Sequence, residues 1–479
     1  MKKMRAAKGL GTLVLLLLAG ACGSSGSSNG GESPTSSGNG NGTGSGGETN
    51  SSTSSGTGSG GSGDTTSSGE ASSGSASSSS ASSSSASSSS ASSSSASSSS
   101  ASSSSSGSSS SSSSSSSSAG DAGAACRPQF ASGVNVAWFN YASDVPNPNI
   151  TKFTSLYTNV YNAGGRIVRW WFHTNGAVTP GYGTNGQATA ISAANIADVK
   201  KILDAAYSAG VAVNISLWAF DMLSGGQSAP VADNLNLLTN DTDRQAYITN
   251  VLTPLVMALK GYHGLYSWEI FNEPEGMTTQ NGWTTGNGAP AGGQEVDESV
   301  IQKTTNWFAA AIHEADPSAL VTVGAWTFLA NSPAVGTNYY SDANLIAAGG
   351  KTNGTLDYYQ VHYYDNWGSP DGADKVNPFH YALSHWDIGD NKPVVIGEFW
   401  DIDTYANGSA PADVIKSANL YTTLYTNGYS GAWAWQYANA DNPGPADYPT
   451  NSEMTSWGTL MQTSIQNLYN AHESAVVCN

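Results

Sequence analysis

Two glutamates in this chain each follow a short apolar run, and their placement suggests a shared acid–base site. Glu273 lies in Trp268-Glu-Ile-Phe-Asn-Glu-Pro, and Glu398 ends Val395-Ile-Gly-Glu. Two carboxyl groups can cleave a glycosidic bond, because one protonates the leaving oxygen and the other meets the positive charge that develops at the anomeric carbon. A separation of about 5 to 5.5 Å implies a covalent intermediate and retention, and about 6.5 to 9.5 Å implies inversion. Spacing along the chain does not measure that separation.

For both glutamates to reach one site, the runs that precede them must lie in one sheet. Short β-branched runs alternate with amphipathic stretches throughout residues 126–479, which is typical of parallel strands joined by helical crossovers. Eight runs predict an α/β fold of the (β/α)8 TIM-barrel type, in which the chemistry lies at the C-terminal strand ends. The predicted strands are 134–138, 166–172, 211–217, 266–271, 320–324, 357–361, 393–397 and 431–435, and the predicted helices include 195–209, 242–259, 298–315, 411–426 and 454–470.

The residues at the predicted strand ends resemble those of the clan A glycoside hydrolases, most closely family 5. Asn-Glu-Pro alone would be weak evidence, but five matches in the correct strands and order make coincidence implausible. The resemblance covers residues 134–435. The matches are Asn272-Glu273-Pro274 after the fourth strand, Gly397-Glu398 after the seventh, Arg169 at the second, His362-Tyr363-Tyr364 at the sixth and Trp435 at the eighth.

The resemblance implies that Glu273 is the acid/base and Glu398 the nucleophile of a retaining enzyme. A nucleophile must stay ionised, and hydrogen bonds from Arg169 and Tyr364 would favour the ionised form of Glu398. Apolar surroundings would raise the pKa of Glu273 towards that of a working acid. The local chemistry expected of each neighbour therefore agrees with the implied roles.

Five further side chains are predicted to contact the sugar. The resemblance implies that Asn272 donates to the sugar 2-hydroxyl, that His362 contacts the acid/base or the departing sugar, and that Trp435 forms a stacking floor. Trp171 and Trp218 lie near strand ends and are predicted to line the same cleft. Five other tryptophans lie near strand ends, and for each of them packing in the core and lining of the cleft are equal alternatives: Trp138, Trp283, Trp326, Trp367 and Trp400.

Several polar residues near these motifs have competing interpretations. Many family members carry a histidine at the end of the third strand, and here Trp218 or Asp221 is expected to fill its space. Glu269 is expected to be a buried structural carboxylate, because it lies too deep for substrate. Glu275 is expected to be a loop charge or a substrate contact, and His173 either lines the cleft or is structural. The histidines show no paired ligand spacing, so neither a metal nor a cofactor is expected.

The first 125 residues are predicted to export and tether the domain. Residues 1–22 combine a basic start, a short apolar run and small residues before Cys22, as in a lipoprotein signal peptide, with an ordinary secretory peptide as the alternative. Residues 23–125 consist mainly of Ser, Gly, Thr and Asn, which predicts a disordered linker because such a segment cannot bury enough apolar surface to fold. We therefore expect a secreted lipoprotein at the cell surface or outer membrane of a bacterium.

Residues 126–479 form the predicted catalytic domain, which two of the three cysteines flank. Cys126 and Cys478 are predicted to form a disulfide that joins its ends, against the alternative of two free thiols. The net charge of −18 disfavours nucleic acid as a partner, and the 14 tryptophans, all within this domain, favour an uncharged polysaccharide. Contact with the membrane is expected only through the lipid anchor, and the protein is expected to be a monomer.

The predicted activity is that of an endo-β-1,4-mannanase acting by double displacement. The Arg169-Trp-Trp stretch and the absent third-strand histidine resemble mannan-active members more than cellulases. An endo-β-1,4-glucanase is the closest alternative, because discrimination between axial and equatorial hydroxyls depends on a few side chains. An exo-acting glycosidase also stays open. From another class, the fold would permit a catalytically silent carbohydrate-binding barrel, although such a protein has no need of two placed carboxylates.

Overall fold

The computed structural model describes residues 127–224, 228–280, 294–364, 375–389, 391–399, 418–437 and 459–477. The predicted signal peptide with Cys22, the predicted linker, Cys126 and Cys478 lie outside these residues, as do Trp283, Trp367 and Trp400. The lipid anchor and the disulfide therefore stay predictions. Within the described ranges, no helix combines the length and the apolar character that a membrane span needs.

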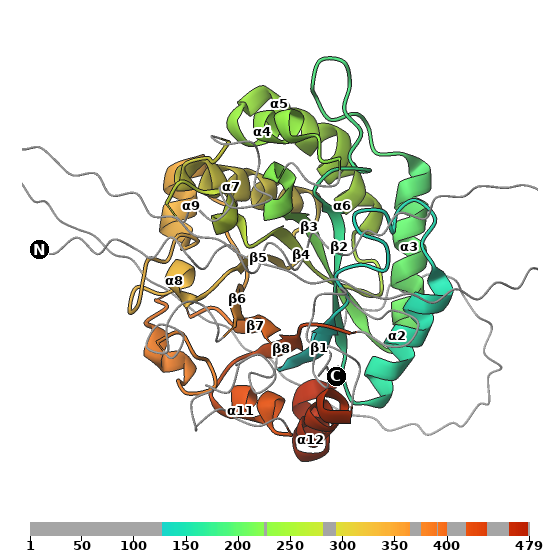
Figure 1. The fold of residues 1–479 in the computed structure, drawn as a ribbon, viewed down its shortest axis with the longest axis vertical. Coiled ribbons are helices and arrows are strands. Elements are labelled where there is room, and N and C mark those ends of the chain that lie inside the picture. Colours follow the sequence, from blue (N-terminus) through green and yellow to red (C-terminus); the bar gives the residue numbers. More distant parts are fainter. Residues whose placement is uncertain are drawn as a thin grey trace, which may run out of the picture. The chain divides into compact units, whose positions relative to one another are not determined.

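Eight parallel strands close into a barrel, in which each strand pairs with the next and the last pairs with the first. Helices surround this ring of strands (Figure 1). The arrangement confirms the (β/α)8 prediction. The strands are β1 (Ala131–Asn135), β2 (Ile167–Thr174), β3 (Ala212–Ala219), β4 (Leu265–Asn272), β5 (Val321–Ala325), β6 (Tyr359–Tyr363), β7 (Val394–Phe399) and β8 (Gly431–Ala434).

All eight strands overlap their predicted ranges, and two of them begin more than one residue away from the predicted start. β1 begins three residues before the predicted 134–138, at small residues that carry little apolar signal but pair with β8. Gly133 is required there, because a Cβ would lie 1.8 Å from the carbonyl oxygen of Ile167 in β2. β6 begins two residues after the predicted 357, since the side chain of Asp357 instead accepts the backbone N–H of Val321 at 2.7 Å.

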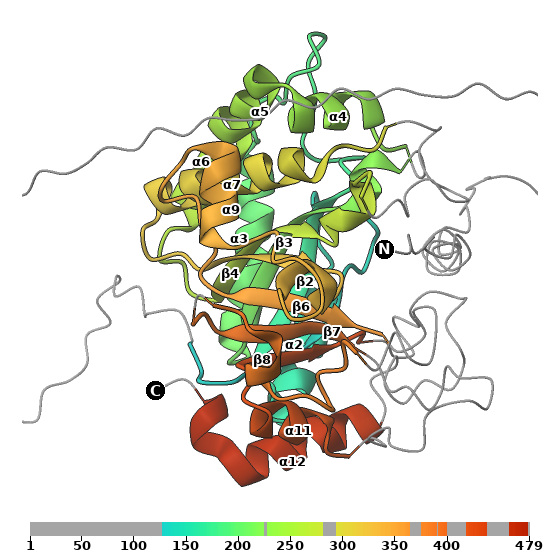
Figure 2. The same ribbon diagram turned by 90° about the vertical axis from the view of Figure 1, so that its left-hand side faces the viewer.

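Helices follow the predicted amphipathic stretches where the structure describes them, while residues 411–417 and 454–458 of two predicted helices lie outside the described ranges. The helices that begin at Ala193 and Glu298 have polar caps. Ser192 accepts the N–H of Asn195, and Asp297 accepts the N–H of Ser299. The predicted 242–259 helix consists of three consecutive helical segments, of which the middle one is a π-helix, Ile248–Leu252. Figure 2 shows α11 and α12 together beside β8. The α-helices are α2 (Ile150–Asn162), α3 (Ala193–Ser208), α4 (Val231–Thr239), α5 (Asp241–Tyr247), α6 (Thr253–Leu259), α7 (Glu298–Ala315), α8 (Phe328–Asn331), α9 (Asp342–Gly349), α11 (Leu420–Thr426) and α12 (Thr459–Val476).

Apolar side chains occupy the space between strands and helices, and the barrel interior divides into two parts. A small cluster that includes Tyr266, Tyr358 and Trp433 fills the interior near the amino ends of the strands. Further along the strands the interior is polar, with buried side chains of Arg169 and Glu269. The interior therefore supports a polar site at the carboxyl ends of the strands.

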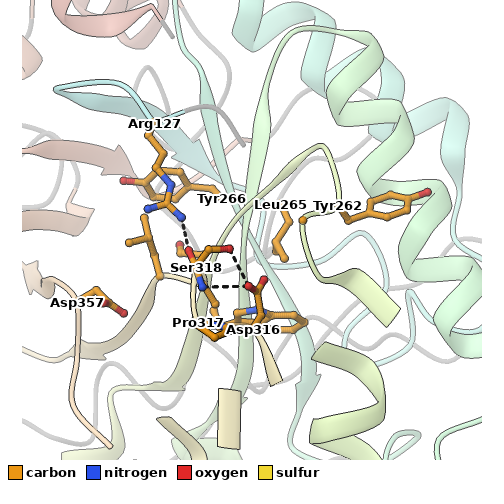
Figure 3. Close-up of a pocket in the computed structure, with 13 residues that line it drawn as sticks. Arg127, Tyr262, Leu265, Tyr266, Asp316, Pro317, Ser318 and Asp357 are labelled. Atoms are coloured by element: carbon orange, nitrogen blue, oxygen red, sulfur yellow. Dashed lines mark hydrogen bonds between the residues drawn. The ribbon is translucent and has the colours of Figure 1, made fainter. Parts of the chain in front are cut away.

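A cavity of about 410 Å³ lies at the amino ends of β4 and β5 (Figure 3). Arg127 donates a hydrogen bond to the carbonyl oxygen of Ser318 at its edge, and Asp316 accepts hydrogen bonds from the Ser318 hydroxyl and N–H. None of the catalytic or substrate-binding residues predicted from the sequence lines this cavity. The predicted site belongs to the opposite ends of the strands.

Gly324→Ala is expected to destabilise the barrel, because its Cβ would lie 2.6 Å from Glu269 Oε1, 3.0 Å from His362 Nε2 and 3.1 Å from an Arg169 nitrogen. These groups hydrogen-bond within the buried interior and cannot move apart freely. The free energy of unfolding should fall by about 1–3 kcal/mol, measured by urea denaturation. Gly389→Ala is the control, since its Cβ would meet no atom within 4 Å. Equal stability of the two variants would contradict the prediction.

Candidate active site

Glu273 and Glu398 meet at the carboxyl ends of the strands. Glu398 lies in β7, and Glu273 directly follows β4. Both are buried, with 5% and 4% of their surface exposed. A carboxylate oxygen of each and a ring nitrogen of His362 all lie within 4.8 Å of one another. Oxygens this close fit the shorter of the two carboxyl separations that glycosidases use, which is that of retaining enzymes.

The turn at Glu273 has an unusual backbone. Its φ and ψ of 45° and 52° lie in the left-handed region, which residues other than glycine rarely adopt. The Glu273 N–H donates to the carbonyl oxygen of Gly324 at 2.6 Å, which ties the turn to β5. Such conformations persist where surrounding contacts enforce them, and they concentrate at functional sites.

Arg169 connects Glu398 to the polar interior. One terminal nitrogen donates to Glu398 Oε1 at 2.5 Å, and the other donates to Asn272 Oδ1 at 2.7 Å. Its Nε and a terminal nitrogen also donate to both oxygens of Glu269, at 2.7 and 2.5 Å. Because Asn272 accepts through its oxygen, its amide nitrogen remains able to donate to another group.

The prediction that Glu269 is a buried structural carboxylate is confirmed. It is fully buried, and besides Arg169 it accepts hydrogen bonds from Asn214, Ser216 and Gln360 at 2.7 to 3.1 Å. These partners occupy the carboxylate so completely that a sugar has no free oxygen to contact. The two amide partners, Asn214 and Gln360, were not predicted, although each stands out as a polar residue within an apolar run.

The environment separates the proton affinities of the two central glutamates. Burial, the charges of Glu398 and Glu275, and to a smaller extent Asp221 raise the pKa of Glu273 well above its ordinary value, and only Arg169 opposes this. Burial also raises the pKa of Glu398, but Arg169 and a 2.5 Å hydrogen bond from Tyr364 lower it by stabilising the carboxylate. Glu273 is therefore the group that keeps its proton to higher pH.

His362 lies in β6 beside both glutamates. Its Nδ1 shares a hydrogen bond of 2.8 Å with Glu273 Oε1 and lies 3.6 Å from Glu398 Oε1. Burial lowers the pKa of His362 well below its ordinary value, so the ring is neutral. Glu273, His362 and Glu398 are close enough to share a metal ion. The cation of Arg169 on Glu398 disfavours a second positive charge there.

Three aromatic residues of the predicted site, Trp171, Trp435 and Tyr364, lie in one buried cluster with Ala137 and Ala219, and Tyr364 hydrogen-bonds to Glu398. The rings of Trp171 and Trp435 are 5.7 Å apart, and partly exposed Trp138 lies 5.3 and 6.5 Å from them. The peptide bond after Trp435 is cis. Trp138, one of the tryptophans with open alternatives, therefore belongs to the edge of the site.

The prediction that Trp218 lines the cleft is wrong. Trp218 is 1% exposed and packs in the core between strands and helices, with its ring 4.8 Å from His173 and 5.6 Å from Tyr247. The register between β2 and β3 shifts between Trp171 and Thr174, so simple alternation of side chains does not extend to the strand ends. Ala219, rather than Trp218, joins the aromatic cluster.

His173 and Asp221 have different outcomes. The structural alternative holds for His173, which is buried, hydrogen-bonded to Thr179 and Tyr247, and has a pKa that burial lowers to about 3. Asp221 follows β3 in η1 (Phe220–Leu223) and is 7% exposed. Burial raises the pKa of Asp221 to about 7, and its charge acts on Glu273. Of the two residues expected to replace the third-strand histidine, Trp218 and Asp221, it is therefore Asp221 that lies closer to the acid/base.

The expectation of a loop charge or substrate contact at Glu275 is wrong. Glu275 lies in η3 (Pro274–Met277) and is fully buried. Its carboxylate accepts hydrogen bonds from the Tyr340 hydroxyl at 2.6 Å and from the Trp326 N–H at 3.2 Å. The sequence offered no signal for this, because Pro274 and Gly276 beside it indicate an exposed turn.

Comparisons with known proteins agree with this geometry. A profile of the family described as "Cellulase (glycosyl hydrolase family 5)" matches residues 130–441. The chain is 37% identical over 322 residues to the mannan endo-1,4-beta-mannosidase of Mytilus edulis, which covers 64% of this chain and 83% of the relative. The mannan endo-1,4-beta-mannosidase of Cryptopygus antarcticus is 36% identical over 326 residues, and the match covers 64% of this chain and 80% of that relative.

Solved structures of such enzymes resemble this fold. The beta-mannanase from the blue mussel Mytilus edulis superimposes with a TM-score of 0.59 at 31% identity, covering 73% of this chain and 97% of that chain. The beta-1,4-D-mannanase from Cryptopygus antarcticus has a TM-score of 0.57 at 30% identity, and the match covers 72% of this chain and 93% of that chain. The similarity therefore spans nearly the whole of each of these two enzymes.

Proposed function

This chain belongs to the cellulase family, glycosyl hydrolase family 5, and from that membership we propose that it hydrolyses β-1,4-linked mannan as a retaining, endo-acting enzyme. The observation that carries the proposal is the buried pair of carboxylates within 4.8 Å, one of which is paired with an arginine. The mannan endo-1,4-beta-mannosidases at 36 and 37% identity favour mannan over glucan.

In the proposed mechanism, Glu273 is the acid/base and Glu398 the nucleophile. Glu273 protonates the oxygen of the scissile bond while a Glu398 oxygen attacks the anomeric carbon, which forms a covalent glycosyl-enzyme and releases one part of the chain. Glu273 then takes a proton from water, which attacks the same carbon and frees Glu398. Arg169 and Tyr364 support this assignment, because both donate hydrogen bonds to Glu398 and stabilise it as an anion.

The proposed sugar contacts come from residues beside this pair. Asn272 has an amide nitrogen free to donate to the 2-hydroxyl while Arg169 fixes its oxygen. Trp435 and Trp171 would offer indole faces to the C–H face of the sugar, and His362, which hydrogen-bonds to Glu273, would contact the departing chain.

The proposal is tested by measuring reducing ends released from galactomannan, glucomannan and carboxymethylcellulose. We expect rapid release from the two mannose-containing polymers and little from carboxymethylcellulose, with a fast fall in viscosity because cleavage is internal. Faster turnover of carboxymethylcellulose would make the chain a glucanase. If the protein bound galactomannan but released no sugar from any of the three, the binding-barrel alternative would replace the proposal.

Tyr364→Phe is expected to move the acidic limb of the kcat/KM–pH profile to higher pH. The Tyr364 hydroxyl lowers the pKa of Glu398, so its removal raises that pKa, and the nucleophile then loses its charge at a higher pH. Tyr182→Phe is the control, since its hydroxyl donates to Asn234 at 2.6 Å, away from the glutamates. An unchanged acidic limb in Tyr364→Phe would argue against Glu398 as the nucleophile.

We further propose that the enzyme is a monomeric surface lipoprotein, with lipid on Cys22, a linker at 23–125 and a catalytic domain at 126–479 closed by a Cys126–Cys478 disulfide. A 2.8 Å backbone hydrogen bond between Phe130 and Ala475 supports the disulfide, because it brings residues close to both cysteines together. Peptide mapping with and without reductant tests the bridge. Cys22→Ser should move the protein from the membrane fraction to the soluble fraction.

A further inference from the structure

The turn that carries Glu273 contains a second buried glutamate, which the mechanism above does not use. Glu275 accepts hydrogen bonds from Tyr340, just before α9, and from the N–H of Trp326, just after β5. The backbone of Glu273 is itself bonded to Gly324 at the end of β5. Two residues of one short turn are thus fixed to the end of the neighbouring strand and to the segment that follows it.

These contacts bear directly on the position of the Glu273 side chain. The left-handed backbone at Glu273 is unfavourable for a glutamate and requires external support. Gly324 supplies that support before the turn, and the Glu275 carboxylate supplies it after the turn. Loss of the second contact would let the turn relax and would move the Glu273 carboxyl away from Glu398.

We propose that Glu275 is a positioning residue for Glu273, whose buried carboxylate clamps the turn after β4 and places a second negative charge behind the acid/base. This inference rests on the proposed function, because it takes Glu273 to be the acid/base. Glu275 would not touch substrate, since its side chain is fully buried.

Burial and hydrogen bonds determine the pH at which Glu275 is ionised. Burial raises its pKa to about 7, while the hydrogen bonds from Tyr340 and Trp326 lower it, so Glu275 is an anion above neutrality. Glu298 is the first residue of α7. Burial and the charge of Glu275 raise the pKa of Glu298 to about 9, so Glu298 is neutral at the pH at which Glu275 becomes an anion. Among the described residues, the charged or titratable groups that face Glu273 are Glu275 from η3, Asp221 from η1, Arg169 from β2, His362 from β6 and Glu398 from β7.

Three variants separate the clamp from the charge. Glu275→Gln keeps the shape and one acceptor but removes the charge, and Glu275→Ala removes both. Glu298→Gln is the matched control, because it makes the same substitution at another buried glutamate of this region, whose charge is not among those that act on Glu273. Thermal unfolding of each variant establishes that it is folded before any comparison.

The first readout is the titration of the Glu273 carboxyl group by ¹³C NMR of glutamate-labelled protein, with its signal identified by its loss in Glu273→Gln. We expect the pKa of Glu273 to fall by about one pH unit in both Glu275 variants, because two charges several ångströms apart in a protein interior interact by about this amount. In Glu298→Gln the pKa of Glu273 should stay unchanged.

The second readout is kcat on mannohexaose below neutrality. Glu275→Gln should stay within about threefold of the parent, and Glu275→Ala should fall at least about tenfold with little change in KM.

An unchanged Glu273 titration in Glu275→Gln would overturn the proposed charge effect, and parent-like kcat in Glu275→Ala would overturn the clamp. A merely structural glutamate would lower stability and rate in both variants without moving the titration. The NMR readout needs no turnover. If the parent cleaved neither mannan nor glucan while the titration still shifted, the proposed function would fail and the coupling between Glu275 and Glu273 would stand.

Discussion

Glu398→Ala is expected to lower mannan hydrolysis by several orders of magnitude, and azide is expected to restore turnover with an α-configured glycosyl azide as product. The carboxylate that would form the covalent intermediate is gone, and the space it leaves can admit a small anion on the same face of the sugar. Product configuration is read by NMR. Glu269→Ala is the control, because its carboxylate also contacts Arg169 but lies deeper in the interior, so azide should not rescue it.

Glu273→Ala should lose activity to a similar degree on polysaccharide, but its rescue should differ. An aryl β-mannoside with a good leaving group can still form the glycosyl-enzyme, and azide then attacks from the opposite face to give the β-azide. If Glu273→Ala gave the α product and Glu398→Ala the β product, the two roles would be exchanged. The higher pKa of Glu273 is consistent with the assignment made here.

Arg169→Ala is expected to lower both stability and activity strongly. It leaves Glu269 buried without a cation, which should reduce the free energy of unfolding by about 3–5 kcal/mol in urea denaturation. It also removes the cation that keeps Glu398 ionised, so kcat/KM should fall by several orders of magnitude. Arg244→Ala is the control. That arginine is as buried as Arg169, but its partner Asp241 is half exposed, and the pair does not include either central glutamate.

A double variant separates the two effects of Arg169. Adding Glu269→Gln to Arg169→Ala removes the unpaired buried charge, so part of the lost stability should return. Activity should stay low, because Glu398 still lacks its cation. Recovery of activity in the double variant would contradict the role proposed for Arg169 and would show that its contribution is only structural.

Much of the site could be predicted because parallel strands carry their functional residues at one end. Glu273, Glu398 and His362 stand at or near the ends of apolar runs, whereas Arg169 lies in the first half of β2 rather than at the predicted strand end. The structure brings all four together. The predictions that were wrong lie where the backbone is irregular. Trp218 lies near a register shift, and Glu275 lies in a turn whose burial depends on Tyr340, which is 65 residues away along the chain.

The amino-acid sequence by itself determined the number and order of the strands, the residues at their ends and the family, because these depend on local periodicity and on motifs that are contiguous in the chain. Only the tertiary structure decided the spacing of the two carboxylates, the face on which Trp218 lies and the burial of Glu275. The physical reason is that barrel closure and register shifts set distances between strands, and no local pattern of residues contains those distances.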